Sequence, residues 1–253
     1  MAQLSVNVNK VATLRNSRGG QVPSVLDAVQ VCIDAGSPGI TVHPRADQRH
    51  ITAADVREIA ARLRAQPATV EFNIEGDPRP DLLDLVEEVR PDQCTLVPVV
   101  PGEVTSQAGW QPGPATETMP ATIARLHACG VRVSLFVDPT SEPINWAASV
   151  GADRIELYTE PYARAFECGR DAGLRAFTRY ADAARVAHGL GLGINAGHDL
   201  DLANLVVFRE LPFLDEVSIG HAIISRAVFV GLRTVVREYL EVLTATSGPA
   251  TAL

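Results

Sequence analysis

The stretch LGINAGHDLDLANLVVFRELPFLDEVSIGH, residues 192–221, contains the pattern that decides the fold. It begins with an apolar strand that leads to Gly-His, continues with a helical segment over 201–209, and ends with a strand over 216–220 that again leads to His. Strand, helix and strand in this order form a βα unit with two parallel strands. If the chain repeats this unit, both Gly-His pairs lie at the same edge of a parallel sheet.

The rest of the chain does repeat it. Short β-branched or apolar runs alternate with segments of helical period, and no Pro- or Ser-rich linker divides them. Many of the helical segments end in glycine-containing turns, such as HACGVRV and HGLGLGI. The predicted strands are 4–8, 39–43, 70–75, 93–98, 131–137, 153–159, 191–195 and 216–220, and the predicted helices are 24–36, 52–65, 79–89, 116–129, 141–149, 169–189, 201–209 and 222–243.

This alternation predicts an α/β fold, a single (β/α)₈ TIM barrel over residues 1–253, with extra short helices allowed and a flexible tail over roughly the last ten residues. The competing prediction is a doubly wound open sheet. In a barrel we expect the inward side chains to form a packed core and the functional groups to lie at the carboxyl ends of the strands.

Composition restricts the partners. The sequence has a formal net charge of −8, which argues against broad nucleic-acid or anionic-membrane binding. Its four cysteines form no CxxC pair and indicate neither a disulfide framework nor a zinc site. The N-terminus does not resemble a signal peptide, and no apolar run approaches the roughly 20 residues of a membrane span. We therefore expect a soluble cytoplasmic protein.

Four histidines stand at or just after predicted strand ends: His43, His50, His198 and His221. Because histidine titrates near neutrality, such a cluster suggests proton transfer. Glycines after the seventh and eighth strands, each close to a helix start, predict a phosphorylated ligand. A barrel would gather at the same rim the further candidates Asn7, Asn9, Arg45, Glu75, Thr105, Glu156 and Gly220.

Taken together, these motifs resemble those of the pyridoxine 5′-phosphate synthase family, the ring-closing enzymes of one vitamin B6 pathway. The resemblance runs through essentially the whole barrel, and it is specific because the motifs occur in the right order at separate strand ends. It rests on VNVNKVATLRNSRGG (6–20), GITVHPRADQRHI (39–51), FNIEG (72–76), LVP and EVT (96–98 and 103–105), ELYTEPYA (156–163), NAGHDL (195–200) and SIGHAIISRAV (218–228).

The resemblance implies a transferase that condenses 3-amino-2-oxopropyl phosphate with 1-deoxy-D-xylulose 5-phosphate to pyridoxine 5′-phosphate, phosphate and water. Schiff-base formation, carbon–carbon closure and dehydration each require proton transfer. The resemblance also implies no metal or organic cofactor, two phosphorylated substrates as partners, and a homo-oligomer, typically an octamer.

Roles for individual residues follow from the same resemblance. His43 and Glu75 match the family's proton acceptors, His198 its proton donor, and Glu156 a carboxylate that stabilises transition states. The positions that match contacts to the amino-oxopropyl phosphate are Asn7, Arg18, Asp199, Gly220 and His221, and those that match contacts to deoxyxylulose phosphate are Arg45, His50 and Thr105. At Asp199 we expect the backbone N–H to bind, while the carboxylate of Asp199 or of Asp201 caps the next helix.

The chain departs from the family at Asn9-Lys10, where many members carry Asp-His. These positions match contacts to deoxyxylulose phosphate, and the exchange alters the local charge. Lys10 admits two interpretations: a cation beside a phosphate, or an amine that itself forms a Schiff base with a substrate.

The residues by themselves are compatible with more than one role and function. Glu75 could simply neutralise Arg18 or Arg45. A metal-dependent hydrolase, another phosphate-binding barrel isomerase or aldolase, and a non-enzymatic phosphometabolite-binding protein are rival functions, although the first strand offers N-x-N where such hydrolases commonly offer H-x-H. The long segment 99–115 fits either a lid that closes over the site or an ordinary surface excursion, and we favour the lid.

Overall fold

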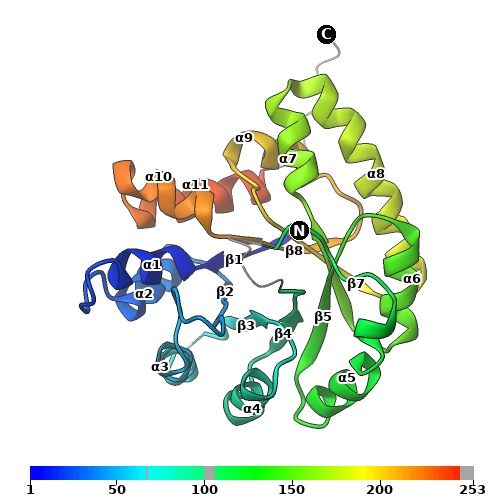
Figure 1. The fold of residues 1–253 in the computed structure, drawn as a ribbon. Coiled ribbons are helices and arrows are strands. Elements are labelled where there is room, and N and C mark those ends of the chain that lie inside the picture. Colours follow the sequence, from blue (N-terminus) through cyan, green and yellow to red (C-terminus); the bar gives the residue numbers. More distant parts are fainter. Residues whose placement is uncertain (67, 100–105, 246–253) are drawn as a thin grey trace.

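Eight parallel strands close into one barrel in sequence order in the computed structural model, which describes residues 1–66, 68–99 and 106–245 (Figure 1). The predicted TIM barrel is therefore confirmed, and the open sheet is wrong. The strands are β1 (Gln3–Asn7), β2 (Gly39–Val42), β3 (Glu71–Gly76), β4 (Gln93–Leu96), β5 (Arg132–Val137), β6 (Arg154–Tyr158), β7 (Gly193–Gly197) and β8 (Leu214–Ile219).

Helices surround this barrel on the outside (Figure 1). Those near predicted positions are α2 (Val25–Ala35), α3 (Ala53–Arg64), α4 (Pro80–Val89), α5 (Met119–His127), α6 (Ser141–Ser149), α8 (Arg170–Gly189) and α9 (Leu202–Phe208). Three short elements lie outside the predicted helices, namely α1 (Asn9–Asn16), the 3₁₀ helix η1 (Pro114–Thr116) and α7 (Glu160–Glu167). Helices of about two turns carry too few periodic apolar positions to be recognised from sequence.

Two of the differences from the predicted bounds lie at a glycine. Gly191 has φ +81 and forms the turn after α8, so β7 starts and ends two residues later than predicted. The predicted helix 222–243 is two helices, α10 (His221–Val230) and α11 (Leu232–Thr244). Gly231 separates them with φ 88 and ψ 141, a conformation that ends a helix and that glycine adopts without steric cost.

The barrel interior is polar, so the expected packed core lies elsewhere. Ser5 Oγ and Thr41 Oγ1 are 2.6 Å apart, and Thr95 donates to Asn73 at 3.0 Å. The alternate residues of these strands, such as Leu4 of β1, are fully buried and belong to the apolar core. Because side chains alternate along a strand, that core lies between the barrel wall and the helices. The rim of the barrel thus rests on hydrogen-bonded polar side chains.

Side-chain hydrogen bonds connect the segments that follow β1 and β2. Arg15 of α1 donates to Asp55 at 2.9 Å, and this pair lowers the pKa of Asp55 despite its burial. Asp55 also accepts from the backbone N–H of Thr52, the residue that caps α3. Asn16 Nδ2 donates to the carbonyl of His50 at 2.8 Å. The end of α1 and the loop 43–52 therefore hold a fixed relative position.

The described part of the segment 99–115 is anchored to the barrel. Trp110 donates its backbone N–H to the Phe136 carbonyl and its indole N–H to the Leu96 carbonyl, both at 2.8 Å. Residues 100–105, including Thr105, and 246–253 of the expected tail lie outside the described residues, so the lid and the tail stay predictions. None of the helices in residues 1–66, 68–99 and 106–245 combines the length and apolar character that a membrane crossing requires.

Candidate functional site

A cavity of about 470 Å³ lies at the carboxyl ends of the strands. This volume is within the usual range for small-ligand sites. Arg18 does not line it and is exposed in the turn after α1, and Thr105 lies outside the described residues. All the other predicted site residues line it: Asn7, Asn9, Lys10, His43, Arg45, His50, Glu75, Glu156, His198, Asp199, Gly220 and His221.

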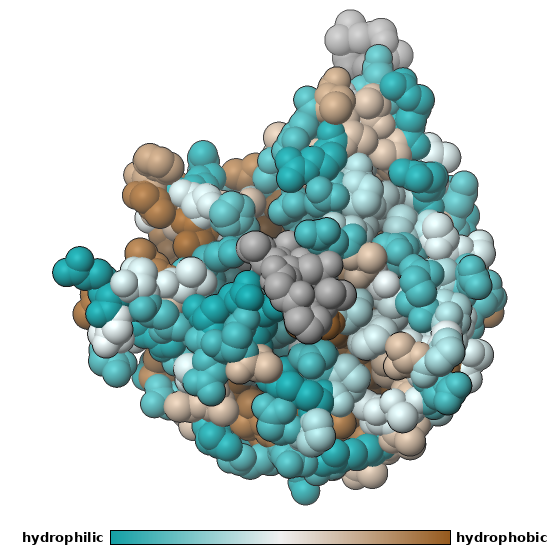
Figure 2. All heavy atoms as spheres, in the orientation of Figure 1, coloured by the Kyte–Doolittle hydropathy of each residue, from teal (hydrophilic) through white to brown (hydrophobic). Residues whose placement is uncertain are grey.

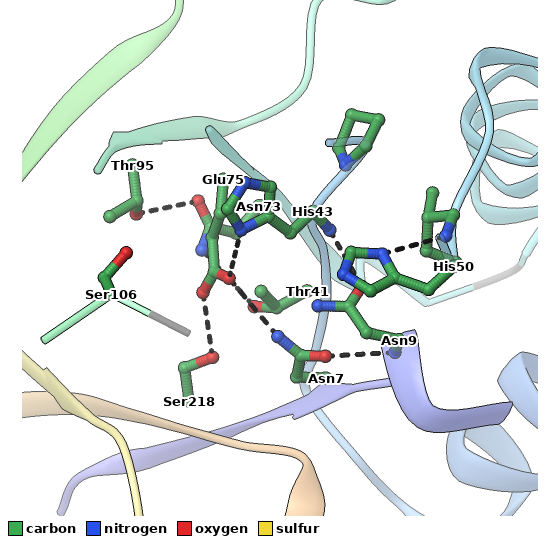
Figure 3. A network of polar contacts seen from close by, with 12 residues as sticks. Asn7, Asn9, Thr41, His43, His50, Asn73, Glu75, Thr95, Ser106 and Ser218 are labelled. Carbon is green, nitrogen blue, oxygen red and sulfur yellow. Dashed lines mark hydrogen bonds and ion pairs between the residues drawn. The ribbon is translucent and has the colours of Figure 1, made fainter. Parts of the chain in front are cut away.

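Glu75 lies at the centre of a polar network that joins four strands (Figure 3). Its Oε1 accepts from Ser218 Oγ and its Oε2 from Asn7 Nδ2, both at 3.3 Å, and His43 Nδ1 is 4.0 Å from Oε2. Burial raises its pKa from 4.5 to about 7, while the Ser218 hydrogen bond acts in the opposite direction. A guanidinium partner would have lowered the pKa, so Glu75 does not serve to neutralise an arginine.

Glu156 is a second buried carboxyl in the same cavity. Gly197 leaves the space that it occupies, because a Cβ atom there would come within 2.3 Å of Glu156 Oε1. Burial, followed by the charges of Glu75 and Glu216, raises the pKa of Glu156 well above its usual value. Its Oε2 has no hydrogen-bond partner among the described residues. Burial therefore favours the protonated form of Glu156.

His43 is a buried, neutral imidazole. Burial lowers its pKa to about 3, and the neighbouring basic residues His50, Arg45 and Arg79 act in the same direction. Its contact with Glu75, at 4.0 Å, is therefore neither an ion pair near neutrality nor a hydrogen bond. The Nε2 atom of His43 is buried and has no partner within the described part of the chain. The ring can accept a proton from a bound molecule.

His198 is held in an uncommon backbone conformation. His198 has φ +94 and Asp199 has φ +58, values that non-glycine residues rarely adopt. Thr159 Oγ1 donates to the carbonyl of Gly197 at 2.7 Å and fixes the preceding peptide. The imidazole packs edge-on against Tyr158, with ring centroids 5.2 Å apart. These contacts hold the His198 ring at the rim of the cavity.

The start of α10 forms one end of the cavity, which Gly220 and His221 line. A Cβ atom at Gly220 would lie 2.9 Å from the Asn7 carbonyl oxygen, so glycine lets β8 approach β1 closely. The first amides of a helix have no acceptor within it and favour anions. Of the two expected cap residues, Asp201 and not Asp199 caps α9, by accepting from the backbone N–H groups of Ala203 and Asn204.

A second end of the cavity presents hydrogen-bond donors. His50 Nδ1 accepts from the Ile51 N–H at 3.0 Å, which leaves Nε2–H as the donor of the neutral ring. Burial lowers the pKa of His50 to about 4, so the ring is neutral. Asn9 Oδ1 accepts from the His43 N–H at 2.9 Å, which fixes its Nδ2 as a donor. With Lys10 and Arg45 beside them, these groups suit an anion.

Sequence reasoning missed some of the lining residues. Ser218 precedes Gly220 by two positions, and strand alternation puts both on one face of β8, so period two alone was a usable signal. Arg49 lies beside His50 in the same loop, but nothing in the pattern separates it from a solvated arginine. Within the described residues, no three His, Cys, Asp or Glu side chains are grouped so as to hold a metal ion.

Known sequences resemble this chain over nearly its full length. Residues 4–245 match the family described as pyridoxal phosphate biosynthesis protein PdxJ. A pyridoxine 5′-phosphate synthase from Christiangramia forsetii is 50% identical over 244 residues, covering 96% of this chain and 100% of that protein. The enzyme of the same name from Porphyromonas gingivalis is also 50% identical over 244 residues, with coverages of 96% and 99%.

Solved structures share the fold at much lower identity. Phosphoribosylanthranilate isomerase from Thermotoga maritima has a TM-score of 0.57 and 11% identity, covering 96% of this chain and 98% of the other. A 4-hydroxy-2-oxoglutarate aldolase has a TM-score of 0.59 and 16% identity, with coverages of 96% and 94%. At these identities the likeness shows the barrel fold alone.

The raised pKa of Glu75 predicts a pH-dependent cost to stability. Below about pH 4 the carboxyl is neutral in the folded and unfolded chain, whereas above pH 7 the folded chain bears a buried charge, so stability falls as pH rises through this window. Glu75→Gln removes the charge. We expect it to gain on the order of 1–3 kcal/mol relative to wild type between pH 4 and pH 8, measured by urea unfolding.

Glu88→Gln provides the control, because Glu88 is an exposed carboxylate paired with Arg57. Its effect on the free energy of unfolding should vary little between pH 4 and pH 8. Identical pH dependence of wild type and Glu75→Gln would contradict the burial effect on Glu75.

Proposed function

Because the chain belongs to the PdxJ family of pyridoxal phosphate biosynthesis proteins, we propose that it is a pyridoxine 5′-phosphate synthase. It would condense 3-amino-2-oxopropyl phosphate with 1-deoxy-D-xylulose 5-phosphate to give pyridoxine 5′-phosphate, phosphate and water. The observation that carries this proposal is one cavity that combines the His43–Glu75 pair with two anion-binding ends. Family membership disfavours the rival hydrolase, isomerase or aldolase and non-enzymatic functions.

His43 and Glu75 would accept protons in this reaction. Condensation of the substrate amine with the ketone forms a C=N bond and releases water, and removal of a proton from the adjacent carbon gives an enamine. A base works best when its pKa lies near the working pH, and burial brings the pKa of Glu75 to about 7. The neutral His43 ring lies next to Glu75, at 4.0 Å, and would relay a proton from substrate to it once the two groups approach in the substrate complex.

His198 would donate a proton in this reaction, and Glu156 would stabilise a cationic intermediate. A hydroxyl leaves more easily when it is protonated, and the His198 ring at the rim is suited to donate that proton. Glu156 keeps its own proton in a buried site, but an iminium cation in the cavity would favour its ionised form. Glu156 would then neutralise the cationic intermediate.

The two donor ends of the cavity would separate the two phosphate groups. The amino-oxopropyl phosphate would bind at the start of α10, contacted by Asn7, the Asp199 backbone, Gly220 and His221. Deoxyxylulose phosphate would bind at the other end, contacted by Asn9, Lys10, Arg45 and His50. Arg18 and Thr105 stay predicted contacts that the described cavity does not include.

Lys10 is the only lysine in a sequence that contains 22 lysine and arginine residues. Every other basic position except the histidines is therefore arginine. A lysine ammonium is a compact point charge, while a guanidinium is a planar fork, so the two are not equivalent beside a bound phosphate. We infer that Lys10 replaces the family's usual Asp-His contacts by charge attraction to the phosphate of deoxyxylulose phosphate.

We further propose that the chain forms a homo-oligomer, an octamer by family resemblance. The surface of α10 supports this, because Val228 and Phe229 are 72% and 87% exposed and apolar residues gather on that helix (Figure 2). Free thiols, including the exposed Cys168, are typical of a reducing compartment and support a cytoplasmic location.

Turnover with the two substrates tests the proposed function. Purified wild type should form pyridoxine 5′-phosphate, followed by absorbance or fluorescence, and His43→Ala should lower kcat by roughly 10²- to 10⁴-fold. Arg57→Ala, which alters only an exposed ion pair, should retain wild-type rates. Absence of product with wild type, or equal rates with His43→Ala, would reject the synthase assignment.

Substitutions of Lys10 separate its two interpretations. If Lys10 attracts a phosphate, Lys10→Ala should raise KM for deoxyxylulose phosphate about tenfold with little change in kcat, and Lys10→Arg should recover part of the loss. If Lys10 is a nucleophile, both variants should be inactive. Borohydride with deoxyxylulose phosphate alone would then add mass to wild type at Lys10, whereas the phosphate interpretation predicts no adduct.

A substitution that introduces a charge on the surface of α10 tests the proposed homo-oligomer. Phe229→Asp should lower the mass measured by light scattering, because a carboxylate in an apolar interface is costly to bury. Leu174→Asp on α8, where the wild-type side chain is 40% exposed, is the matched control and should leave the mass unchanged. A wild-type monomer would overturn the oligomer proposal.

A further inference from the structure

Ser218 donates a hydrogen bond to Glu75. Neither the family resemblance nor the proposed reaction assigns a role to this serine. Building on the proposed synthase function, we propose that Ser218 is a positioning residue that holds Glu75 as the ionised member of the buried Glu75–Glu156 carboxyl pair, so that Glu156 keeps the shared proton.

The geometry of Ser218 connects the two carboxyls. It lies on β8 and Glu75 on β3, with β1 and β2 between them in the barrel, so their 3.3 Å hydrogen bond crosses the lumen. In the opposite direction, Ser218 pairs with Gly197 of β7, and Gly197 leaves the space that Glu156 Oε1 fills. Ser218 is itself 7% exposed. Ser218 therefore lies near both carboxyls, and its hydroxyl donates to Glu75 and not to Glu156.

The donors around the two carboxyls are unequal. Glu75 accepts from the Ser218 hydroxyl on one oxygen and from the Asn7 amide on the other. Glu156 Oε2 is buried with no partner in the part of the chain that the structure describes. Donors stabilise a carboxylate and not its protonated form, so charge on Glu75 and a proton on Glu156 is the favoured arrangement.

The remaining titratable groups that face Glu75 do not compete for this proton. His43, directly after β2, has a pKa lowered to about 3, so it is neutral near pH 7. Cys94 of β4 has a pKa raised to about 12 by burial and by the Glu75 charge, so it keeps its own proton. Glu216 of β8 is also buried, with a pKa raised to about 8, but its charge acts on Glu156 and not on Glu75. Glu156 is therefore the second site for the proton, and the Ser218 hydrogen bond affects where the charge resides.

The consequence for catalysis is a division of roles between two chemically identical groups. A base must be ionised before substrate arrives, and an acid must be protonated. Without the hydroxyl, the two carboxyls would differ less, and Glu75 would hold a proton over a wider pH range. The Ser218 hydroxyl therefore keeps Glu75 available as the base at lower pH than burial alone would permit.

The test is the pH profile of kcat for Ser218→Ala. Loss of a hydrogen bond to a charged group should move the acidic limb upward by about one pH unit, with KM for both substrates within about twofold of wild type. One pH unit below the limb, the rate should fall about tenfold relative to wild type, while the plateau at higher pH is retained. Ser218→Thr keeps the hydroxyl and should restore the wild-type limb.

Ser134→Ala is the matched control. Ser134 is another buried serine of the barrel interior, on β5, and its Oγ has no hydrogen-bond partner among the described residues. It should leave the pH profile unchanged. A purely structural role of Ser218 would lower the folded fraction without moving the limb, and an unmoved limb in folded, active Ser218→Ala would overturn the inference.

A second measurement is independent of turnover. In protein labelled with ¹³C at glutamate carboxyls, the Glu75 resonance, assigned with Glu75→Gln, should titrate about one pH unit higher in Ser218→Ala than in wild type. An unchanged titration midpoint would overturn the inference even if the enzyme were active. A moved midpoint in a protein that makes no product would reject the proposed function and retain the role of Ser218.

Discussion

Closure of the sheet between β8 and β1 is the constraint on which the site depends. The parallel pairing of Ser5 with Ser218 and Val6 with Ile219 converts eight strands into a ring. Only in a ring can Ser218 reach Glu75, a residue 143 positions earlier in the chain, across a lumen one side chain wide. The same closure brings Gly220 against Asn7 and so sets the start of α10 beside the first strand.

The polar interior gives the carboxyls their chemistry. In many barrels branched apolar side chains fill the lumen, whereas here hydroxyls and amides such as Thr41, Asn73 and Thr95 hydrogen-bond to one another across neighbouring strands. Their hydrogen bonds satisfy buried groups that would otherwise be costly. Glu75 and Glu156 sit above this layer, buried enough for their pKa values to rise but beside donors that make them unequal.

The fold was accessible from sequence because its signals are local. Apolar runs, capping residues such as Thr52 and glycines after helices each act within a few positions, and together they locate the strands. The strand ends then bring together most of the site residues. Their individual roles came from the motif resemblance, since local pattern does not assign a proton donor or acceptor.

The features of the site that could not be predicted from the sequence depend on contacts across the barrel. Ser218 was visible as part of a motif, yet its partner lies on the other side of the lumen. Arg18 belongs to a recognised motif, but the turn after α1 leaves it exposed and outside the cavity. The unequal environments of Glu75 and Glu156 depend on burial from several strands at once, which no single segment encodes.

Lys10 is the one lysine of the protein, and its side chain lines the cavity. Because Lys10 lines the cavity and every other Lys or Arg position is arginine, reagents that acylate or alkylate amines find their one side-chain target inside the cavity. Acetylation of this side chain would remove the only ammonium side chain from the chain and leave the guanidinium charges intact. Modification of the lysine side chain in this protein therefore reports on the cavity and on whether it is occupied.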